Sequence, residues 1–254
     1  MVLAVDIGNT DIAIGGFEND ALRFVVRIST DTTKTVQEYE NIIYQMLTQK
    51  GVDKDTVEGA IVSSVVPSLS WVLSEVMSNL YSVSALHVSN KIETGIDIRC
   101  DDPSSVGADL ICACVAARYK HMTPSLVVDM GTATKLIAVS DDGAFIGVSI
   151  MPGVMMGMRS LSSGTAQLPQ ISLDAPPCAI GRNTVDCMKS GIVFGNAAMI
   201  DGMIERFCEE YGYDVPVYAT GGFSPSIVPY CKRKITLDEN MVLEGLYIIY
   251  NNNR

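Results

Sequence analysis

The sequence predicts an α/β protein built from two similar lobes that face each other across a cleft. An apolar run, a polar turn that begins with Asp6 and a second apolar run occupy residues 2–14, and residues 125–139 repeat this arrangement around Asp129. Such a repeat is typical of a duplicated structural unit. The 254 residues suffice for two lobes with separate cores. We therefore expect an N-terminal lobe over residues 1–118 and a C-terminal lobe over residues 119–254.

The composition describes a well-packed protein and argues against several classes of partner. Hydrophobic residues make up 48% of the chain and charged residues 19%, and the formal net charge is −11. This charge repels polyanions, and no long basic stretch is present, so we expect no binding of nucleic acid. The seven cysteines lack a C-x-x-C spacing, which favours reduced thiols and a cytoplasmic location. Because no apolar segment reaches about 18 residues, we expect no membrane span.

The first lobe should continue from its hairpin into a strand, a helix and another strand. Residues 21–28 read as the third strand. From Thr35 the apolar residues recur with helical period, and Gly51 is a typical stop for this helix. Residues 57–66 form the next apolar strand. The alternation is that of a mixed α/β lobe.

Three further elements complete the first half. Residues 68–80 should form a helix that carries Trp71, the only tryptophan, which we expect in the core. A short strand follows at residues 85–88, where His87 is expected to be a structural histidine. A helix rich in small residues should run from Val106 to Ala117, with its cysteines serving as packing residues.

The second lobe should begin near His121 with the repeated hairpin. A further strand leads to Pro152-Gly153, followed by a helix whose three methionines we expect to fill gaps in the core. Gly181-Arg182-Asn183-Thr184 precedes a long helix. The strand at residues 217–220 ends in Gly221-Gly222, which leaves backbone room for a nucleobase or ribose, although a plain tight turn has the same signature.

The turn at residues 6–10 has the chemistry of a phosphate-binding loop. Gly8 and Asn9 can take positive φ, and the backbone at Gly8 can approach a phosphate closely. Asn9 and Thr10 add side-chain donors. Asp6 would then hold a hydrated Mg²⁺ ion facing the phosphate oxygens. An ordinary hairpin would use the same residues, so this turn alone leaves both interpretations open.

With these motifs in order, the chain resembles the type III pantothenate kinases, members of the superfamily of acetate kinase, sugar kinases, Hsp70 and actin. The resemblance covers almost the whole chain and rests on the order and spacing of eight short motifs: residues 6–10, 66–67, 107–109, 129–134, 152–153, 165–169, 181–184 and 220–222. It implies two ribonuclease-H-like lobes, as in actin-like ATPases, each with a mixed sheet flanked by helices. It also implies an ATP-binding cleft and a homodimer.

The resemblance assigns roles to individual residues. Asp109 corresponds to the general base that accepts the proton of the pantothenate hydroxyl, although a carboxylate at a helix N-terminus can also be merely structural. Asp129 corresponds to the ligand of a monovalent cation, K⁺ or NH₄⁺. The implied acceptor contacts are Gly107, Ala108, Asp109, Leu110 and Thr184. The implied ATP contacts are Asp6, Ile7, Gly8, Asn9, Thr10, Asp11, Ile12, Ala13, Thr132, Gly221 and Gly222.

Four positions depart from the family pattern. Leu110 stands where the family has an arginine that pairs with the substrate carboxylate, and Cys100 stands in place of a substrate-contacting tyrosine. Lys135 and Ile137 replace the threonine and aspartate that usually follow the Asp129 motif. The ATP half of the pattern is thus better preserved than the acceptor half.

We expect an ATP-dependent kinase that phosphorylates pantothenate to 4'-phosphopantothenate, the first step of coenzyme A biosynthesis. Two alternatives stay open from the sequence. One is a kinase for a different acceptor, because Leu110 removes the charge that selects a carboxylate. The other is a nucleotide-binding paralogue that regulates a partner without catalysis. No P-loop motif is present, so metal ions and turn N–H groups must neutralise the phosphates.

Overall fold

The computed structural model describes residues 1–89 and 91–254 and contains two compact units. The first unit comprises Met1–Asp97, Asp101–Tyr119 and Met241–Arg254, and the second comprises Ile98–Cys100 and Lys120–Asn240. The expected division at residue 118 placed the last segment of the chain in the second lobe. The contacts place it instead in the first unit, because its helix packs on the first sheet. In the described part of the chain, no helix has the length and apolar character needed to cross a membrane.

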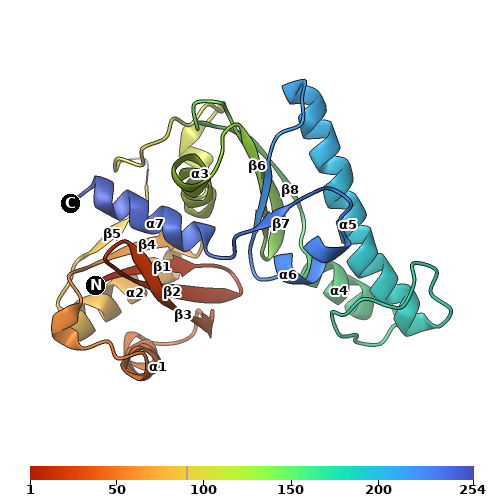
Figure 1. The fold of residues 1–254 in the computed structure, drawn as a ribbon. Coiled ribbons are helices and arrows are strands. Elements are labelled where there is room, and N and C mark those ends of the chain that lie inside the picture. Colours follow the sequence, from red (N-terminus) through yellow and green to blue (C-terminus); the bar gives the residue numbers. More distant parts are fainter. Residues whose placement is uncertain (90) are drawn as a thin grey trace. The chain divides into compact units, whose positions relative to one another are not determined.

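The first unit is built on a five-stranded mixed sheet (Figure 1). β1 pairs antiparallel with β2 and parallel with β4, so the chain crosses over before it returns to the sheet. The strands, in spatial order, are β3 (Ala21–Ser29), β2 (Asp11–Glu18), β1 (Val2–Ile7), β4 (Gly59–Ser64) and β5 (Ala85–His87). These bounds confirm the expected hairpin and strands to within two residues at most ends.

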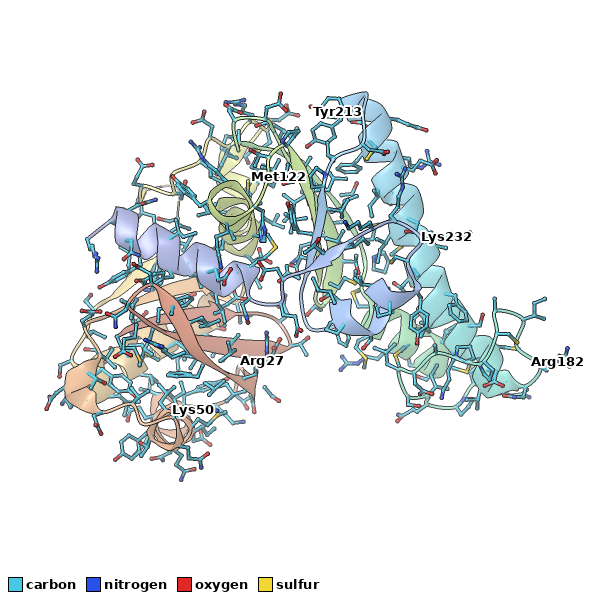
Figure 2. The ribbon with its side chains drawn as sticks, viewed as in Figure 1. Arg27, Lys50, Met122, Arg182, Tyr213 and Lys232 are labelled. Carbon is cyan, nitrogen blue, oxygen red and sulfur yellow. The ribbon has the colours of Figure 1, made fainter. Side chains whose placement is uncertain are left out.

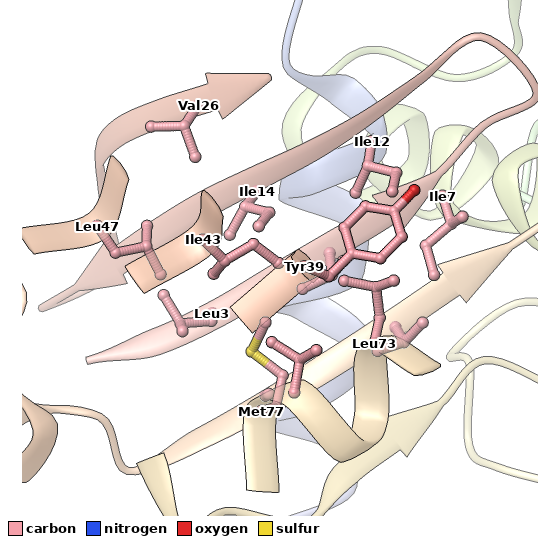
Figure 3. Packing of buried hydrophobic residues seen from close by; sticks show 14 of the residues in the cluster. Leu3, Ile7, Ile12, Ile14, Val26, Tyr39, Ile43, Leu47, Leu73 and Met77 are labelled. Atoms are coloured by element: carbon pink, nitrogen blue, oxygen red, sulfur yellow. The ribbon is translucent and has the colours of Figure 1, made fainter. Parts of the chain in front are cut away.

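Two helices, α1 (Val36–Gln49) and α2 (Pro67–Tyr81), cover one face of this sheet. Thr35 caps the N-terminus of α1 and forms a capping box with Glu38, as its position before the first apolar residue of the helix suggests. Gly51 follows the C-terminus of the helix with a φ of +76°. The apolar side chains of both helices pack against alternate residues of the strands in one core (Figure 3). The short helices η1 (Lys54–Thr56) and η2 (Pro103–Ser105) lie in connections.

Trp71 was expected in the core, and that expectation is wrong, since 64% of its surface is exposed. The buried residues of α2 include Leu69, Leu73 and Met77, which recur every four positions. Trp71 is two residues from Leu69 and therefore lies about 200° around the helix, on the far side from the sheet. His87 agrees with its expected structural role, because its Nε2 lies 2.8 Å from the Ser74 hydroxyl.

The other face of the first sheet contacts α7 (Met241–Asn252), which packs on β1, β2 and β4 (Figure 1). α7 also approaches α3 (Ala108–Lys120) very closely: a Cβ added at Gly245 would lie only 1.9 Å from the Cys112 carbonyl oxygen. Only glycine fits at this crossing. The cysteines of α3, Cys112 and Cys114, are fully buried, which confirms that they are packing residues.

The second unit repeats the topology of the first. Its sheet has β6 in the centre, paired antiparallel with β7 and parallel with β9, as β1 is with β2 and β4. The strands, in spatial order, are β10 (Thr236–Leu237), β9 (Val217–Thr220), β6 (Ser125–Met130), β7 (Ala133–Val139) and β8 (Phe145–Pro152). The duplication expected from the two hairpins therefore extends to the whole sheet.

Helices α4 (Val154–Ser163), α5 (Thr184–Tyr211) and α6 (Ser224–Ile227), with η3 (Val228–Tyr230), pack with the second sheet around a separate core. Of the three methionines expected to fill this core from α4, Met158 is buried and Met155 packs against the cluster. Met156 is 49% exposed, so its expected core role is wrong. It lies between the other two on the helix and faces away from them.

Candidate active site

The turn between β1 and β2 is held by main-chain contacts. Gly8 N donates to Asp11 O at 3.0 Å, and the Thr30 hydroxyl donates to Gly8 O at 2.7 Å. Gly8 and Asn9 do not have the positive φ that we expected, because a three-residue connection braced by Thr30 closes the hairpin without it. Asn9 and Thr10 are exposed at its tip. The turn is therefore a preformed backbone loop with polar side chains presented outward.

Asp6 lies on the face of the first sheet opposite α1 and α2. Leu3, Val5 and Ile7 point into the core beneath those helices, so the alternation of β1 directs Asp6 to the other face. Its neighbour across the antiparallel pair is Ala13, and its neighbour across the parallel pair is Ser63.

Asp109 begins the first turn of α3, where the carbonyl of Gly107 accepts from Leu110 N and Ile111 N at 3.1 and 3.2 Å. Its carboxylate folds back toward Gly107: a Cβ at Gly107 would lie 2.7 Å from Asp109 Oδ1. The same oxygen accepts from Leu110 N at 2.9 Å. The glycine is therefore a steric requirement for the position of this carboxylate, and the helix N-terminus favours its negative charge.

The Cys112 thiol connects these two carboxylates. Burial raises its pKa well above the usual value, and the charges of Asp6 and Asp109 raise it further. The charges of Asp6 and Asp109 thus both act on Cys112, although 103 positions of the sequence separate the two residues. Cys112 was assigned only to packing from the sequence, and nothing in the local pattern of α3 indicated this neighbourhood.

In the second unit, Asp129 is paired with Lys135. The two residues stand opposite each other in the β6–β7 register, and Lys135 Nζ donates to Asp129 Oδ2 at 2.7 Å. Both side chains are largely buried, with 11% of Asp129 and 18% of Lys135 exposed. This is a buried ion pair one residue before the hairpin turn.

The other residues of the second unit that the sequence predicted to contact ATP lie around that pair. A Cβ at Gly221, whose φ is +89°, would lie 2.7 Å from Asp129 Oδ1, and one at Gly153 would lie 2.1 Å from Thr132 O. Both glycines therefore allow a close backbone approach to the β6–β7 hairpin. Gly222 has open space where a side chain would be. The structure brings Asp129, Thr132 and Gly221 together.

Thr184 lies elsewhere in this unit, as the first residue of α5. With Gly181, Arg182 and Asn183 it lines a pocket of about 700 Å³ that also has apolar walls from α4 and α5. Figure 2 shows Arg182 near this end of α5, with Tyr213 beyond its other end. The lining of the pocket does not include Asp129, Thr132 or the glycines at 221 and 222.

Comparison with known proteins decides the family. The family model described as type III pantothenate kinase matches residues 2–206. The type III pantothenate kinase of Myxococcus xanthus (strain DK1622) is 39% identical over 253 residues, covering 100% of this chain and 99% of the relative. That of Moorella thermoacetica is 38% identical over 253 residues, covering 100% of both chains. This chain belongs to the type III pantothenate kinase family.

Solved structures support the fold of this family member. A conserved putative Baf family transcriptional activator from Campylobacter jejuni matches with a TM-score of 0.58 and 20% identity, covering 98% of this chain and 97% of the other. Component A of the (R)-2-hydroxyglutaryl-CoA dehydratase of Acidaminococcus fermentans has the same TM-score at 13% identity, covering 98% and 96%. At these identities the likeness shows a shared two-lobed α/β fold, as the sequence predicted.

For a kinase of this family, the residues present fit a magnesium ion better than a monovalent cation. Mg²⁺ usually keeps several waters and uses one or two carboxylates together with substrate phosphates, and the Asp6 carboxylate beside the exposed turn suits that role. Within residues 1–89 and 91–254, no three His, Cys, Asp or Glu side chains are grouped to hold a metal alone. At Asp129 the Lys135 ammonium already stands at hydrogen-bond distance, so this site does not fit K⁺.

The acceptor residues of the kinase also depart from the family pattern in the structure. Leu110 is 7% exposed in α3, directly after the proposed base, and an apolar side chain there cannot bind a carboxylate. Cys100 belongs to the short segment Ile98–Cys100 of the second unit, where Arg99 N donates to Phe145 O at 2.8 Å. Neither residue supplies the hydrogen bonds of an arginine or tyrosine.

Proposed function

We propose that this protein transfers the γ-phosphate of ATP to the hydroxyl of pantothenate, the first step of coenzyme A biosynthesis. The observation that carries the proposal is the match of residues 2–206 to the family model, within which the first turn of α3 supplies a carboxylate, Asp109, that can accept a proton. The two curated relatives described above are named type III pantothenate kinases, and each matches this chain over its full length. In this proposal Asp6 acts at the phosphates of ATP, and Asp109 acts at the hydroxyl of the acceptor.

Asp109 acts as the general base. It takes the proton of the attacking hydroxyl as the oxygen–phosphorus bond forms. Cys112 stays a neutral thiol because its pKa is raised, so it adds no third negative charge to the site. Leu110 N donates to Asp109 Oδ1 at 2.9 Å and holds the carboxylate in place, and Gly107 leaves room for it.

Asp6 and the loop through Ala13 receive the phosphates. The backbone of the turn and the side chains of Asn9 and Thr10 supply donors, and Asp6 would hold Mg²⁺ through water. When bound, Mg²⁺ neutralises phosphate charge. We assign Thr132, Gly221 and Gly222 of the second unit to ATP as well, since their glycines leave backbone room for a flat ligand.

A changed acceptor is the second candidate, and the buried Leu110 is the observation that favours it. A pantothenate carboxylate without its arginine loses a charge-assisted contact worth about 1.5–3 kcal/mol. An acceptor that lacks the carboxylate, such as pantetheine, never used that contact. Gly107, Ala108 and Thr184 remain available for the rest of the molecule.

The cellular setting follows from the same proposal. We propose that the ligands are small molecules, that the protein works in the cytoplasm and that it forms a homodimer. Two large apolar side chains of the second unit are exposed and suit such an interface, Ile180 at 80% and Met156 at 49%. The net charge of −11 supports the absence of nucleic acid among the partners.

The decisive experiment measures phosphorylated product from purified protein with ATP, Mg²⁺ and either pantothenate or pantetheine. Product from pantothenate supports the principal proposal, and product from pantetheine alone supports the changed acceptor. Calorimetry should show ATP binding in both cases. ATP binding without any product would contradict both kinase proposals and favour a nucleotide-binding regulator.

A further inference from the structure

Asp129, the carboxylate expected to bind a monovalent cation, lies beside the positively charged side chain of Lys135. Asp129 and Lys135 are cross-strand partners in the antiparallel pair β6–β7, so their side chains emerge side by side on the same face. The distance between Lys135 Nζ and Asp129 Oδ2 is 2.7 Å, typical of a charge-assisted hydrogen bond.

The surroundings fix the orientation of this pair. Gly221 approaches the second oxygen, Asp129 Oδ1, and a Cβ there would lie 2.7 Å from it. The turn after Asp129 is tight, because Gly131 N donates to Ala133 O at 3.2 Å. With the Gly221 backbone packed against one carboxylate oxygen, the other is directed to Lys135. The ion pair is therefore an ordered part of the hairpin and not a chance contact between two mobile side chains on the surface.

Charge balance at this position differs from that of the family pattern. The pattern has two carboxylates, at 129 and 137, whereas this chain has Asp129, Lys135 and a fully buried Ile137. One carboxylate and one ammonium leave the pair neutral. A second cation close to Asp129 would meet the repulsion of Lys135 in a setting that water screens poorly.

We propose that the ammonium of Lys135 takes the place of the monovalent cation, so that this kinase needs neither K⁺ nor NH₄⁺. A lysine head group carries one positive charge and three N–H donors. Because it is covalently attached, its local concentration does not depend on the salt outside. The inference rests on the proposed function for its meaning in catalysis, but cation binding at Asp129 can be tested without turnover.

The first test measures thermal unfolding of the complete protein in KCl, NaCl and choline chloride at equal ionic strength. Wild-type protein should unfold at the same temperature in all three salts, because no site selects K⁺. The variant Lys135→Thr/Ile137→Asp, which restores the family residues, should be stabilised specifically by KCl through mass action. Lys189→Thr breaks another Lys–Asp pair of this unit, with Asp174 at 2.6 Å, and should show no specific effect of K⁺.

The second test measures ATP affinity by calorimetry in the same salts. Wild-type affinity should change less than about twofold between K⁺ and choline, whereas the restored variant should bind ATP about tenfold more tightly in K⁺. Lys135→Arg keeps the charge and should behave like the wild type. If the restored variant does not fold, an unfolding temperature or ATP affinity of the wild type that rises specifically in K⁺ still overturns the inference.

A rise in unfolding temperature or ATP affinity of the wild type that is specific to K⁺ overturns the inference. A restored variant that folds and yet ignores K⁺ overturns it as well, because Lys135 is then only a structural partner. These readouts need no product. A protein that binds ATP independently of K⁺ but phosphorylates nothing would therefore contradict the proposed function and leave the inference about Lys135 standing.

Discussion

The two hairpins β1–β2 and β6–β7 occupy equivalent places in sheets of the same topology, yet their aspartates have different neighbours on the adjacent strand. Asp6 and Asp129 each lie one residue before the end of their strand. The residue opposite Asp6 is Ala13, whereas the residue opposite Asp129 is Lys135. The charge beside each carboxylate is thus decided by a single cross-strand position.

This difference shows how a duplicated fold can acquire two functions. The strand order and the parallel neighbours are set by main-chain pairing and apolar alternation, and both units share them. The side chains beside the turn are free to diverge. In the first unit the charge of the aspartate helps to raise the pKa of the Cys112 thiol, and in the second the aspartate belongs to a neutral pair.

The largest effect is expected when the neutral pair is broken. Asp129→Asn leaves Lys135 as a largely buried charge without its carboxylate and should lower the free energy of unfolding by about 3–5 kcal/mol. Denaturant unfolding followed by circular dichroism measures this loss. The control is Asp129→Asn/Lys135→Met, which removes both charges and should recover much of the stability. Equal stability of the single variant and the wild type would show that the pair is not a charged unit.

The variant Asp109→Asn, in α3 of the first unit, should lower turnover and leave the stability of the fold unchanged. The amide is nearly isosteric but cannot take the proton, so turnover should fall by a factor of about 10² or more. ATP affinity should stay unchanged. Asp101→Asn, an exposed residue before η2, is the matched control. Full activity of Asp109→Asn would reject this residue as the base.

The two acceptor positions that depart from the family pattern, Leu110 of the first unit and Cys100 of the second, give an intermediate effect. Cys100→Tyr combined with Leu110→Arg should raise kcat/KM for pantothenate about tenfold to a hundredfold, the equivalent of one charge-assisted contact. Because Leu110 is buried, the unfolding temperature of the variant must be measured first. If the wild type already uses pantothenate as well as relatives with both residues, Arg159 or Arg182 is the next group to test for contact with the carboxylate.

The smallest effect concerns an exposed pair of the second unit. The hydrogen bond from Arg99, followed by that from Ser140, lowers the pKa of Asp142 to about 2. A lowered folded pKa means that this pair stabilises the fold above the unfolded pKa of roughly 4 and that the contribution is lost as pH falls toward 2. Carboxyl NMR titration should show the Asp142 pKa rising in Arg99→Gln. In the first unit, the hydrogen bond from Lys34 lowers the pKa of Asp31 in the same direction, and that pKa should not respond to Arg99→Gln.

Local signals predicted the elements of both units well. The capping residue Thr35, the stop at Gly51 and the repeated hairpins act over a few residues, so the sequence carries them directly. Lys135 was recognised as a departure from the family pattern after the Asp129 motif, but the direction of its side chain could not be known before the strand register was. Trp71 was misplaced because its hydrophobicity was weighed without its position on the helix.

Long-range features could not be predicted in this way. The action of the Asp6 and Asp109 charges on one thiol depends on where α3 lies in the first unit, and no pattern within either segment encodes it. The placement of α7 in the first unit has the same origin, since an amphipathic helix can cover either sheet. Its contact at Gly245 appears only once the partner helix is known.

The return of α7 to the first sheet also sets an order of events during synthesis on the ribosome. Domains generally fold as they emerge, with the N-terminal one first. Here the strands β1, β2 and β4 lack one covering layer until residues 241–252 have been translated, after every residue of the second unit. The unit that is begun first is therefore completed last, and the second unit has its whole sequence available for folding before the first does.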